Sequence, residues 1–301
     1  MEGIKRVLLL SVRYAEDTDV FVREMRELDG AVLMRSSLKE LDFTIINNRP
    51  KIFDRANNLD MAEYDLVILR NTHVLYSLDW FESVSLYLRN AGVRIVDDVE
   101  VSGAFLGKIS QMFRFALAGL PVPDTVVSHT NLPEQLLQND MADRFIFKAN
   151  AGIKGKSNYL LTTAIEAEKI QAAAEDVFLA QRFVENDGDY RVLFIGKDIA
   201  PLIFKRMRGA ESDSHTNNTS AGGRAEVVGV DDFDAEALEI ARKLRKLIDK
   251  ELIGIDLIQD KNSGRWYILE VNTTPALCSG AFGNEKKELF EKFLNLKMKE
   301  M

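Results

Sequence analysis

A pair of apolar strands near the C-terminal end limits what this chain can fold into more than any other feature. The first covers residues 252–260, LIGIDLIQD, and the second covers residues 266–272, WYILEVN. The polar residues KNSGR between them favour a turn, so we expect the two strands to pair as an antiparallel hairpin. The rest of the fold has to accommodate the sheet that contains this hairpin.

Polar side chains interrupt both strands at positions that the hairpin would bring together. Successive side chains of a strand point to opposite faces, so Glu270 and Asn272 share one face while Leu269 and Val271 pack on the other. If the strands pair, Asp256 joins Glu270 and Asn272. Carboxylate and amide oxygens are hard ligands that suit magnesium. The pattern predicts a magnesium site, and the alternative is a polar patch at the end of a sheet.

The composition is typical of a folded, cytoplasmic enzyme. The length of 301 residues favours about two domains. Of these residues, 46% are hydrophobic and 29% are charged. The net charge of -8 gives no general attraction to nucleic acid or anionic membranes. No stretch approaches the roughly 20 apolar residues of a membrane span. The single cysteine, Cys278, excludes an intramolecular disulfide and fits a reducing compartment, and a buried thiol is a better interpretation of it than a nucleophile.

The first hundred residues alternate apolar strands with amphipathic helices, which predicts an α/β fold with a parallel sheet. Strands are expected over residues 6–12, 65–70 and 93–98, and helices over residues 19–28 and 78–90. A further helix around Lys108 ends at Gly119, before two prolines. Arg70, at the end of a strand, is a candidate for contacting a substrate carboxylate, and an exposed salt-bridge partner is the alternative.

From residue 144 onwards the pattern changes to paired strands. Residues 144–162 predict a hairpin around a glycine-containing loop, followed by a helix over 165–175 and a strand over 177–184. Residues 190–196 and 200–207 predict a second hairpin. Residues 209–224 are rich in Gly, Ser, Asn and Thr and are expected to form a functional or disordered loop. A helix over 233–250 precedes the C-terminal strands, and a charged helix ends the chain.

Several basic and glycine residues are candidates for binding phosphates. Lys148 ends a strand, and the loop after it holds Gly152 and Gly155, whose backbone N–H groups suit anionic oxygens. The loop is close to a P-loop, with Lys156 in the motif position, but Asn150 stands where the first glycine belongs. A P-loop kinase is therefore one alternative. Lys108 is a second cation for the phosphates.

The segment QRFVENDGDYRV, residues 181–192, combines an apolar strand edge with carboxylates and suits an adenine and a ribose. The hairpin that follows contributes three basic residues, and each is unremarkable alone: Arg191, Lys205 and Arg206. Together they are expected to cover phosphates or an acidic substrate.

Taken in order, these segments resemble the ATP-grasp superfamily, with its glutathione synthetase-type fold, and within it the RimK-like carboxylate–amine ligases. The resemblance covers about two-thirds of the chain and rests on Lys108, Lys148 with the glycine loop, Gln181–Val184, Asp189–Arg191, Arg206, Asn217–Gly223, Gly254–Asp256 and Glu270–Asn272. It implies an N-terminal α/β (pre-ATP-grasp) domain over 1–100 and a two-lobed α+β ATP-grasp domain. The first lobe, with the glycine loop, would cover 101–184, and the second lobe, with the metal site and a C-terminal helix, would cover 185–301.

The resemblance also implies a role for each matching position. Most of these positions would bind ATP: Lys108, Lys148, Gly152, Gly155, Gln181, the backbone of Arg182, Phe183 and Val184, Asp189, Asn217 and Asn218. Asp256, Glu270 and Asn272 would hold two Mg²⁺ ions, with Mn²⁺ as an alternative metal and Glu270 bridging. Arg191 and Arg206 would be the catalytic arginines. Two positions depart from the family pattern: Arg182 replaces an acidic residue, and Thr216 replaces an arginine for which Arg208 or His215 is a candidate substitute.

The reaction implied is ATP-dependent formation of an amide or peptide-like bond, through an acyl phosphate, with release of ADP and phosphate. The substrates would be a carboxylate and an amine, the amine coming from an amino acid, a small metabolite or a peptide tail. A nucleotide-binding regulator that has lost its chemistry is the alternative from another functional class. The sequence leaves open the identity of both substrates and whether the protein forms homo-oligomers.

Overall fold

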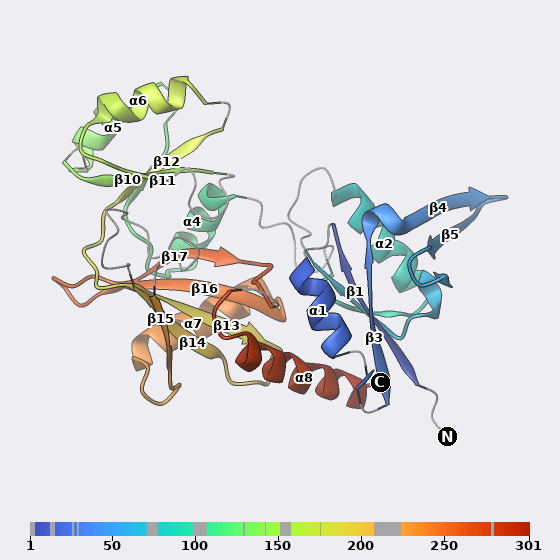
Figure 1. Cartoon of the computed structure of the whole chain (residues 1–301). Helices are drawn as coiled ribbons and strands as arrows, with labels where there is room; N and C mark the ends of the chain where they lie inside the picture. The colour runs from blue at the N-terminus through green and yellow to red at the C-terminus, as the bar shows by residue number, and fades with distance from the viewer. Residues whose placement is uncertain are drawn as a thin grey trace.

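The computed structural model describes residues 4–12, 16–25, 27–28, 30–70, 78–98, 107–128, 130–141, 143–150, 158–174, 176–207, 224–277 and 280–301. Its elements fall into three groups, which we call the N-terminal region, the first lobe and the second lobe (Figure 1). The candidate residues Gly152, Gly155, Asn217 and Asn218 lie outside the described residues, as do Cys278, Lys156, Arg208, His215 and Thr216. Among the helices that are described, none is long and apolar enough to cross a membrane.

The N-terminal region, residues 4–98, is built on a mostly parallel five-stranded sheet in the order β2-β3-β1-β7-β8. The strands are β1 (Lys5–Ser11), β2 (Glu27–Leu28), β3 (Ala31–Ser37), β7 (Leu66–Leu69) and β8 (Arg94–Val96), and the helices are α1 (Glu16–Glu24) and α2 (Leu78–Asn90). The expected α/β class is confirmed, and so is the helix over 78–90. The first helix ends at Glu24 because the residues after it pair antiparallel with β3.

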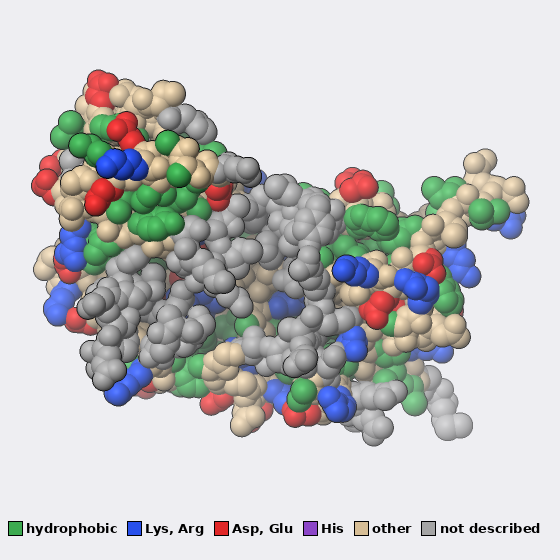
Figure 2. Space-filling view, turned by 45° about the horizontal axis from the view of Figure 1, so that its top comes forward, with side chains coloured by type: hydrophobic (Ala, Val, Ile, Leu, Met, Phe, Trp, Pro, Cys, Tyr) green, Lys and Arg blue, Asp and Glu red, His purple; other side chains and the backbone are tan. Residues whose placement is uncertain are grey.

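A smaller three-stranded sheet projects from this region: β4 (Leu41–Ile46), β5 (Arg49–Asp54) and β6 (Leu59–Asp60), with short 3₁₀ helices η1 (Leu38–Glu40) and η2 (Met61–Glu63) beside it. Asn47 and Asn48 form the turn between β4 and β5, with φ of 52° and 60°. Positive φ at both central residues is the geometry that a two-residue hairpin turn favours. Figure 2 shows the hairpin extending away from the rest of the molecule.

The first lobe is a four-stranded antiparallel sheet in the order β11-β10-β12-β9, with two short helices. Its elements are β9 (Thr125–Val126), α5 (Leu132–Gln138), β10 (Phe145–Ala149), β11 (Asn158–Leu161), α6 (Ala164–Ala172) and β12 (Phe178–Arg182). Buried apolar side chains from both layers form a core of its own, in which Phe147 and Phe178 stack 4.7 Å apart. The expected hairpin between β10 and β11 is confirmed.

The second lobe is a five-stranded antiparallel sheet in the order β15-β14-β13-β16-β17. Its elements are β13 (Asp189–Ile195), β14 (Leu202–Met207), β15 (Arg224–Val228), α7 (Ala235–Ile248), β16 (Leu252–Gln259), β17 (Trp266–Asn272) and α8 (Gly283–Lys299). Helix α4 (Lys108–Leu117) also packs here, because Met112 and Phe115 join α7 in the core on one face of this sheet. Both expected hairpins, β13–β14 and β16–β17, are confirmed.

The other face of the second-lobe sheet shares a single core with the N-terminal region. Leu193, Leu252 and Phe204 of the second lobe cluster with Phe290 of α8 and with Leu9 of β1. In Figure 1, α8 runs from the second-lobe sheet to the N-terminal sheet. The N-terminal region and the second lobe are therefore joined by buried apolar surface, whereas the first lobe has a separate core.

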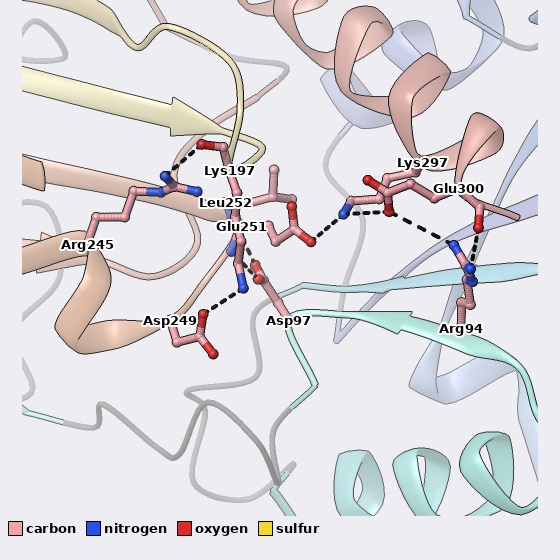
Figure 3. A network of polar contacts seen from close by, with 9 residues as sticks. All are labelled: Arg94, Asp97, Lys197, Arg245, Asp249, Glu251, Leu252, Lys297 and Glu300. Carbon is pink, nitrogen blue, oxygen red and sulfur yellow. Dashed lines mark hydrogen bonds and ion pairs between the residues drawn. The ribbon is translucent and has the colours of Figure 1, made fainter.

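Polar contacts reinforce this junction (Figure 3). Asp97 follows β8 and accepts hydrogen bonds from the backbone N–H groups of Glu251, at 2.7 Å, and Leu252, at 3.4 Å. Glu251 in turn pairs with Lys297 of α8 at 2.7 Å. Burial raises the pKa of the Asp97 carboxyl, a change that the positive charges of Lys250 and Arg70 oppose. Asp97 thus holds the end of β8, in the N-terminal sheet, at the start of β16, in the second-lobe sheet.

Candidate functional site

The polar end of the second-lobe sheet brings three predicted residues into one row across neighbouring strands. Arg191 of β13 lies opposite Asp256 of β16, and Asp256 lies opposite Glu270 of β17. Asn272 lies two residues beyond Glu270, opposite Gly254. Cross-strand partners share a face of an antiparallel sheet, so all of these side chains emerge on the same side. The hairpin predicted from the sequence therefore does bring Asp256, Glu270 and Asn272 together.

An irregularity in β17 determines which residues face this site. The pairing shifts between Asp256 and Leu257, so that Asp256 lies opposite Glu270 while Leu257 lies opposite Ile268. Leu269 is the extra residue of this bulge. Ile268 and Val271 are buried in the core, whereas Leu269 is only half-buried. The expectation that Leu269 packs beside Val271 is therefore wrong, because the bulge interrupts the simple alternation of side chains.

Two arginines bind the carboxylate of Asp256. Arg191 donates from Nε to Oδ1 and from Nη2 to Oδ2, the latter at 2.7 Å, and Arg206 donates to Oδ2 at 2.9 Å. Burial alone would raise the pKa of the Asp256 carboxyl, but Arg191 and Arg206 outweigh it and hold this pKa below its ordinary value. A carboxylate has about four acceptor positions. These three contacts leave about one of them for a further ligand.

Arg206 also donates to Asp189, its cross-strand neighbour. Burial lowers the pKa of this guanidinium, but Asp256 and Asp189 outweigh burial and raise it. The two arginines and two carboxylates thus form one charge network, in which Asp189, Arg206 and Asp256 are buried and the Arg191 side chain is 14% exposed. Asp189, which the resemblance assigns to the nucleotide, is 7% exposed and engaged by Arg206.

Glu270 and Asn272 are half-buried and offer two further oxygen ligands on this face. The Asn272 Oδ1 atom accepts a hydrogen bond from the Thr274 backbone at 3.0 Å, which fixes the direction of the amide. Within the described residues no three His, Cys, Asp or Glu side chains form a metal-binding group. Two carboxylates and one amide oxygen nevertheless fit Mg²⁺, which takes oxygen ligands and fills its shell with water and substrate phosphates.

Lys148 faces this site from the first lobe. It lies on β10 and donates from Nζ to Gln181 Oε1 on the neighbouring strand β12, at 2.7 Å. The pKa of the Lys148 amine is lowered to about 8: burial lowers it most and Lys108 lowers it as well, while the carboxylates of Glu270, Asp256 and Asp189 oppose the change. The amine is therefore close enough to the second-lobe carboxylates and to Lys108 to be influenced by all of them.

Lys108 is placed by the start of α4. The side-chain oxygen of Asn150, just after β10, accepts from the Ile109 backbone at 3.0 Å, and its backbone oxygen accepts from the Lys108 N–H at 3.4 Å. Gly107 permits this approach, because a Cβ there would lie 2.5 Å from Asn150 Oδ1. Asn150, which departs from the P-loop pattern, thus ties the helix that carries Lys108 to the strand that carries Lys148.

The segment expected to bind adenine runs from Gln181 to Val184. Gln181 is 2% exposed and donates to Thr125 Oγ1 and to Met112 Sδ, both at 3.2 Å. The side chain of Arg182 instead pairs with Asp124 at 2.8 Å on the surface. The Arg182 charge is thus neutralised by a surface partner.

The other two residues of this segment differ in their packing. The guanidinium carbon of Arg144 lies over the Phe183 ring, 3.9 Å from the ring centroid. Val184 is buried. Neither the ring contact of Phe183 nor the burial of Val184 was predicted from the sequence.

One polar residue beside the site, Gln111, was not predicted from the sequence. Gln111 of α4 is 7% exposed, and its amide hydrogen-bonds both backbone groups of Val271. The sequence did hold a signal for Gln111, which lies on the same helix face as the apolar Met112 and Phe115. A polar side chain on a buried face nearly always has a hydrogen-bond partner.

Comparisons with known proteins identify the family. The RimK-like ATP-grasp domain family matches residues 108–285. The chain belongs to the RimK-like ATP-grasp family. This match covers more than half of the chain and starts at the lysine that begins α4. ATP and a divalent metal ion are the cofactors of this family.

Curated relatives of this RimK-like protein are ligases. The alpha-aminoadipate–LysW ligase of Sulfurisphaera tokodaii is 25% identical over 234 residues, which cover 74% of this chain and 77% of the relative. The tetrahydromethanopterin:alpha-L-glutamate ligase of Methanosarcina acetivorans is 26% identical over 275 residues, covering 79% and 82%. The expected reaction class, ATP-dependent formation of carbon–nitrogen bonds, is confirmed, and nothing in these relatives supports the alternative of a silent regulator.

Solved structures confirm the ATP-grasp fold over almost the whole chain. The ATP-grasp ligase PsnB, complexed with a minimal precursor, Mg and ADP, has a TM-score of 0.67 at 16% identity and covers 95% of this chain and 97% of its own. D-cycloserine synthetase DcsG has a TM-score of 0.66 at 14% identity and covers 97% and 99%. At these identities the likeness concerns the fold alone.

Proposed function

We propose that this RimK-like protein joins the carboxylate of one substrate to the amine of an amino acid, using the site between the two lobes. The observation that carries the proposal is the row Arg191, Asp256 and Glu270 on the second lobe, with Lys148 opposite it on the first. Cations and oxygen ligands on facing lobes suit a triphosphate with its metal.

The ATP phosphates would be bound by the two lysines. Lys108 and Lys148 approach from α4 and β10, and Gln181 orients the Lys148 amine. The carboxylate oxygen of the first substrate would attack the γ-phosphorus, ADP would leave, and an acyl phosphate would form. The amine nitrogen would then attack the acyl carbon, with loss of phosphate and a proton. No protein nucleophile is needed for either step.

Glu270, Asn272 and the remaining acceptor position of Asp256 would hold the metal. We propose that these residues would hold two Mg²⁺ ions, or Mn²⁺ in their place, with Glu270 as a shared ligand, and that the metal would neutralise the triphosphate charge. Arg191 and Arg206 would stabilise the charge that develops on the acyl phosphate, from positions that Asp256 and Asp189 fix in advance. Asp256 thus has two roles in this proposal.

We propose an acidic amino acid as the first amine substrate to test. The relatives named above act on alpha-aminoadipate or glutamate, as does the glutamate–LysW ligase of Sulfurisphaera tokodaii, which is 23% identical to this chain. The candidates for the carboxylate substrate are a glutamyl side chain, a peptide C-terminus and a small carboxylic acid. The domain bounds 1–100, 101–184 and 185–301 remain part of this proposal.

Release of ADP by the purified protein tests the function. ATP and Mg²⁺ are supplied with pools of amino acids and of carboxylic acids or peptides, and Glu270→Gln is run in parallel with Glu291→Gln, which changes an exposed glutamate of α8. We expect ADP with certain pools for the wild type and for Glu291→Gln, and none for Glu270→Gln. Equal activity of Glu270→Gln and the wild type would contradict the proposed metal ligands.

A further inference from the structure

The side chain of Gln111 takes the place of a strand at the edge of the second-lobe sheet. Its Nε2 donates to the Val271 carbonyl at 3.2 Å, and its Oε1 accepts from the Val271 N–H at 2.9 Å. Strand β17 is the last strand of the sheet order, so among the described strands none pairs with its outer backbone groups. One carboxamide therefore satisfies both backbone groups of a single edge residue.

The position of the clamped residue matters because Val271 lies between Glu270 and Asn272, two of the proposed metal ligands. The bulge at Leu269 interrupts the regular pairing of β17 immediately before this point. On the outer side, Ile268 donates to the Pro121 carbonyl at 2.9 Å. After the bulge, Gln111 holds the outer side of the backbone from which both ligands project, while β16 pairs with its inner side.

Gln111 also connects this strand to the phosphate side of the site. It lies one turn after Lys108 on α4, and residues three apart share a helix face. Its neighbour Met112 accepts a hydrogen bond from Gln181, which holds the Lys148 amine. One helix therefore contacts the metal-binding strand, carries one proposed phosphate ligand and supports the partner of the other.

We propose that Gln111 is a positioning residue that sets the distance between the metal ligands on β17 and the phosphate-binding lysines. It acts through the Val271 backbone and touches neither substrate nor metal. The inference rests on the proposed function of Glu270 and Asn272 as ligands. Outer partners of metal ligands typically change metal affinity by about 10–100-fold when they are removed.

The chain contains a matched control for this contact. Gln171 of α6, which is half-buried, makes a similar pair of contacts in the first lobe: its Nε2 donates to the Asp176 carbonyl at 3.1 Å, and its Oε1 accepts from the Phe178 N–H at 3.2 Å. Gln171→Met and Gln111→Met each remove one donated and one accepted side-chain hydrogen bond, and methionine has a volume similar to that of glutamine. If loss of such a pair of hydrogen bonds acted only through general stability, Mn²⁺ binding would follow the stability of each variant rather than the position of the glutamine.

Binding of Mn²⁺ in the presence of ADP, followed by the electron paramagnetic resonance of free Mn²⁺, tests the proposal without turnover. We expect Gln111→Met to weaken Mn²⁺ binding by about tenfold or more, and Gln171→Met to bind as the wild type does. Thermal unfolding of each variant without metal reports the structural part of the effect. Equal Mn²⁺ affinity of Gln111→Met and the wild type would overturn the inference.

Two further outcomes are distinguishable. If the wild type itself binds no Mn²⁺ with ADP, the proposed metal site fails, and with it this inference. If Gln111→Met does not fold, Gln111→Glu replaces it, because a carboxylate keeps the acceptor for the Val271 N–H and loses the donor to its carbonyl. We expect weakened Mn²⁺ binding from Gln111→Glu as well, and wild-type affinity in a folded Gln111→Glu protein would overturn the proposal.

Discussion

Arg191 binds Asp256 through two parallel hydrogen bonds across neighbouring strands, and both side chains are largely removed from solvent, with 14% and 4% exposure. Bidentate pairs of this kind fix geometry as well as charge. Because Arg206 shares the same carboxylate, loss of the Asp256 charge would leave two buried guanidinium groups without their common partner.

We predict that Asp256→Asn destabilises the protein in the absence of metal and nucleotide. Removing one member of a buried ion pair costs about 3–5 kcal/mol. Asp249→Asn is the matched control, because Asp249 pairs with Lys197 on the surface, with 58% and 49% exposure respectively, where a pair contributes about 0–1 kcal/mol. Urea unfolding in EDTA measures both. Equal stability losses in the two variants would show that the Asp256 network has no special weight.

We predict that nucleotide binding is linked to protonation of Lys148. The pKa of its amine is lowered to about 8, so the amine is partly neutral at pH 8, and bound phosphates would raise the pKa again. ADP binding at pH 8 should therefore take up a fraction of a proton, and at pH 6.5 almost none.

Calorimetry of ADP binding in buffers of different ionisation enthalpy measures this uptake. Lys148→Met should abolish it, while Lys169→Met, which changes an exposed lysine of α6, should keep it. The lowered pKa of Lys148 also makes the free energy of unfolding depend on pH. Between about pH 8 and the ordinary pKa of 10.5, the unfolded state binds more protons at this amine than the folded state does. The contribution of Lys148 to stability therefore increases as the pH rises through that window.

We predict that Gly188→Ala disturbs the start of β13. Gly188 has φ of +130°, and a Cβ there would lie 2.5 Å from the Arg206 carbonyl oxygen. Gly264 has φ of +73° with open space around its Cβ position, so Gly264→Ala should cost only the left-handed strain of about 1–2 kcal/mol. Gly188→Ala should lower the unfolding free energy by more than Gly264→Ala. The reverse order in urea unfolding would count against the close approach.

We predict that Asp97→Asn loosens the junction between the N-terminal region and the second lobe. Asparagine tolerates the left-handed backbone of this residue, whose φ is 59°, so the backbone should not change. An amide offers one oxygen in place of two to the N–H groups of Glu251 and Leu252, and leaving a buried donor unsatisfied costs about 1–3 kcal/mol.

Hydrogen exchange at Glu251 and Leu252 measures the Asp97→Asn effect, and it should accelerate in that variant. Asp65→Asn is the control, because Asp65 accepts from the Arg6 backbone at a position that is 32% exposed. If Asp65→Asn accelerated exchange at Glu251 equally, the Asp97 contact would not be the cause.

The strands and helices that carry the site could be predicted because each has a strong local pattern. The apolar residues of β16 and β17 and the turn between them made their pairing predictable, and with it the meeting of Asp256 and Glu270. The charge network was not predictable, because the sequence does not show that Arg191 and Asp256 fall at the same height of two strands.

Elements with weak local signals were missed. Strand β3 and the β4–β5 hairpin were not predicted, although Asn47 and Asn48 are residues that tolerate the positive φ of the hairpin turn. The bulge at Leu269 was missed because the alternation of β17 reads as regular, and only packing of Ile268 and Val271 into one core reveals it. The clamp by Gln111 joins residues 160 positions apart, which no local pattern reports.

The shared core of the N-terminal region and the second lobe limits how this protein can be re-engineered. Exchanging residues 1–100 with those of a relative would replace Leu9 and its neighbours while leaving Leu193, Leu252 and Phe290 to face a foreign surface. Mismatched cores lose packing energy and order. Chimaeras designed to transfer substrate choice should therefore carry α8 together with the N-terminal residues, which keeps those contacts within one parent, and should also match the second-lobe residues Leu193 and Leu252 to the new surface.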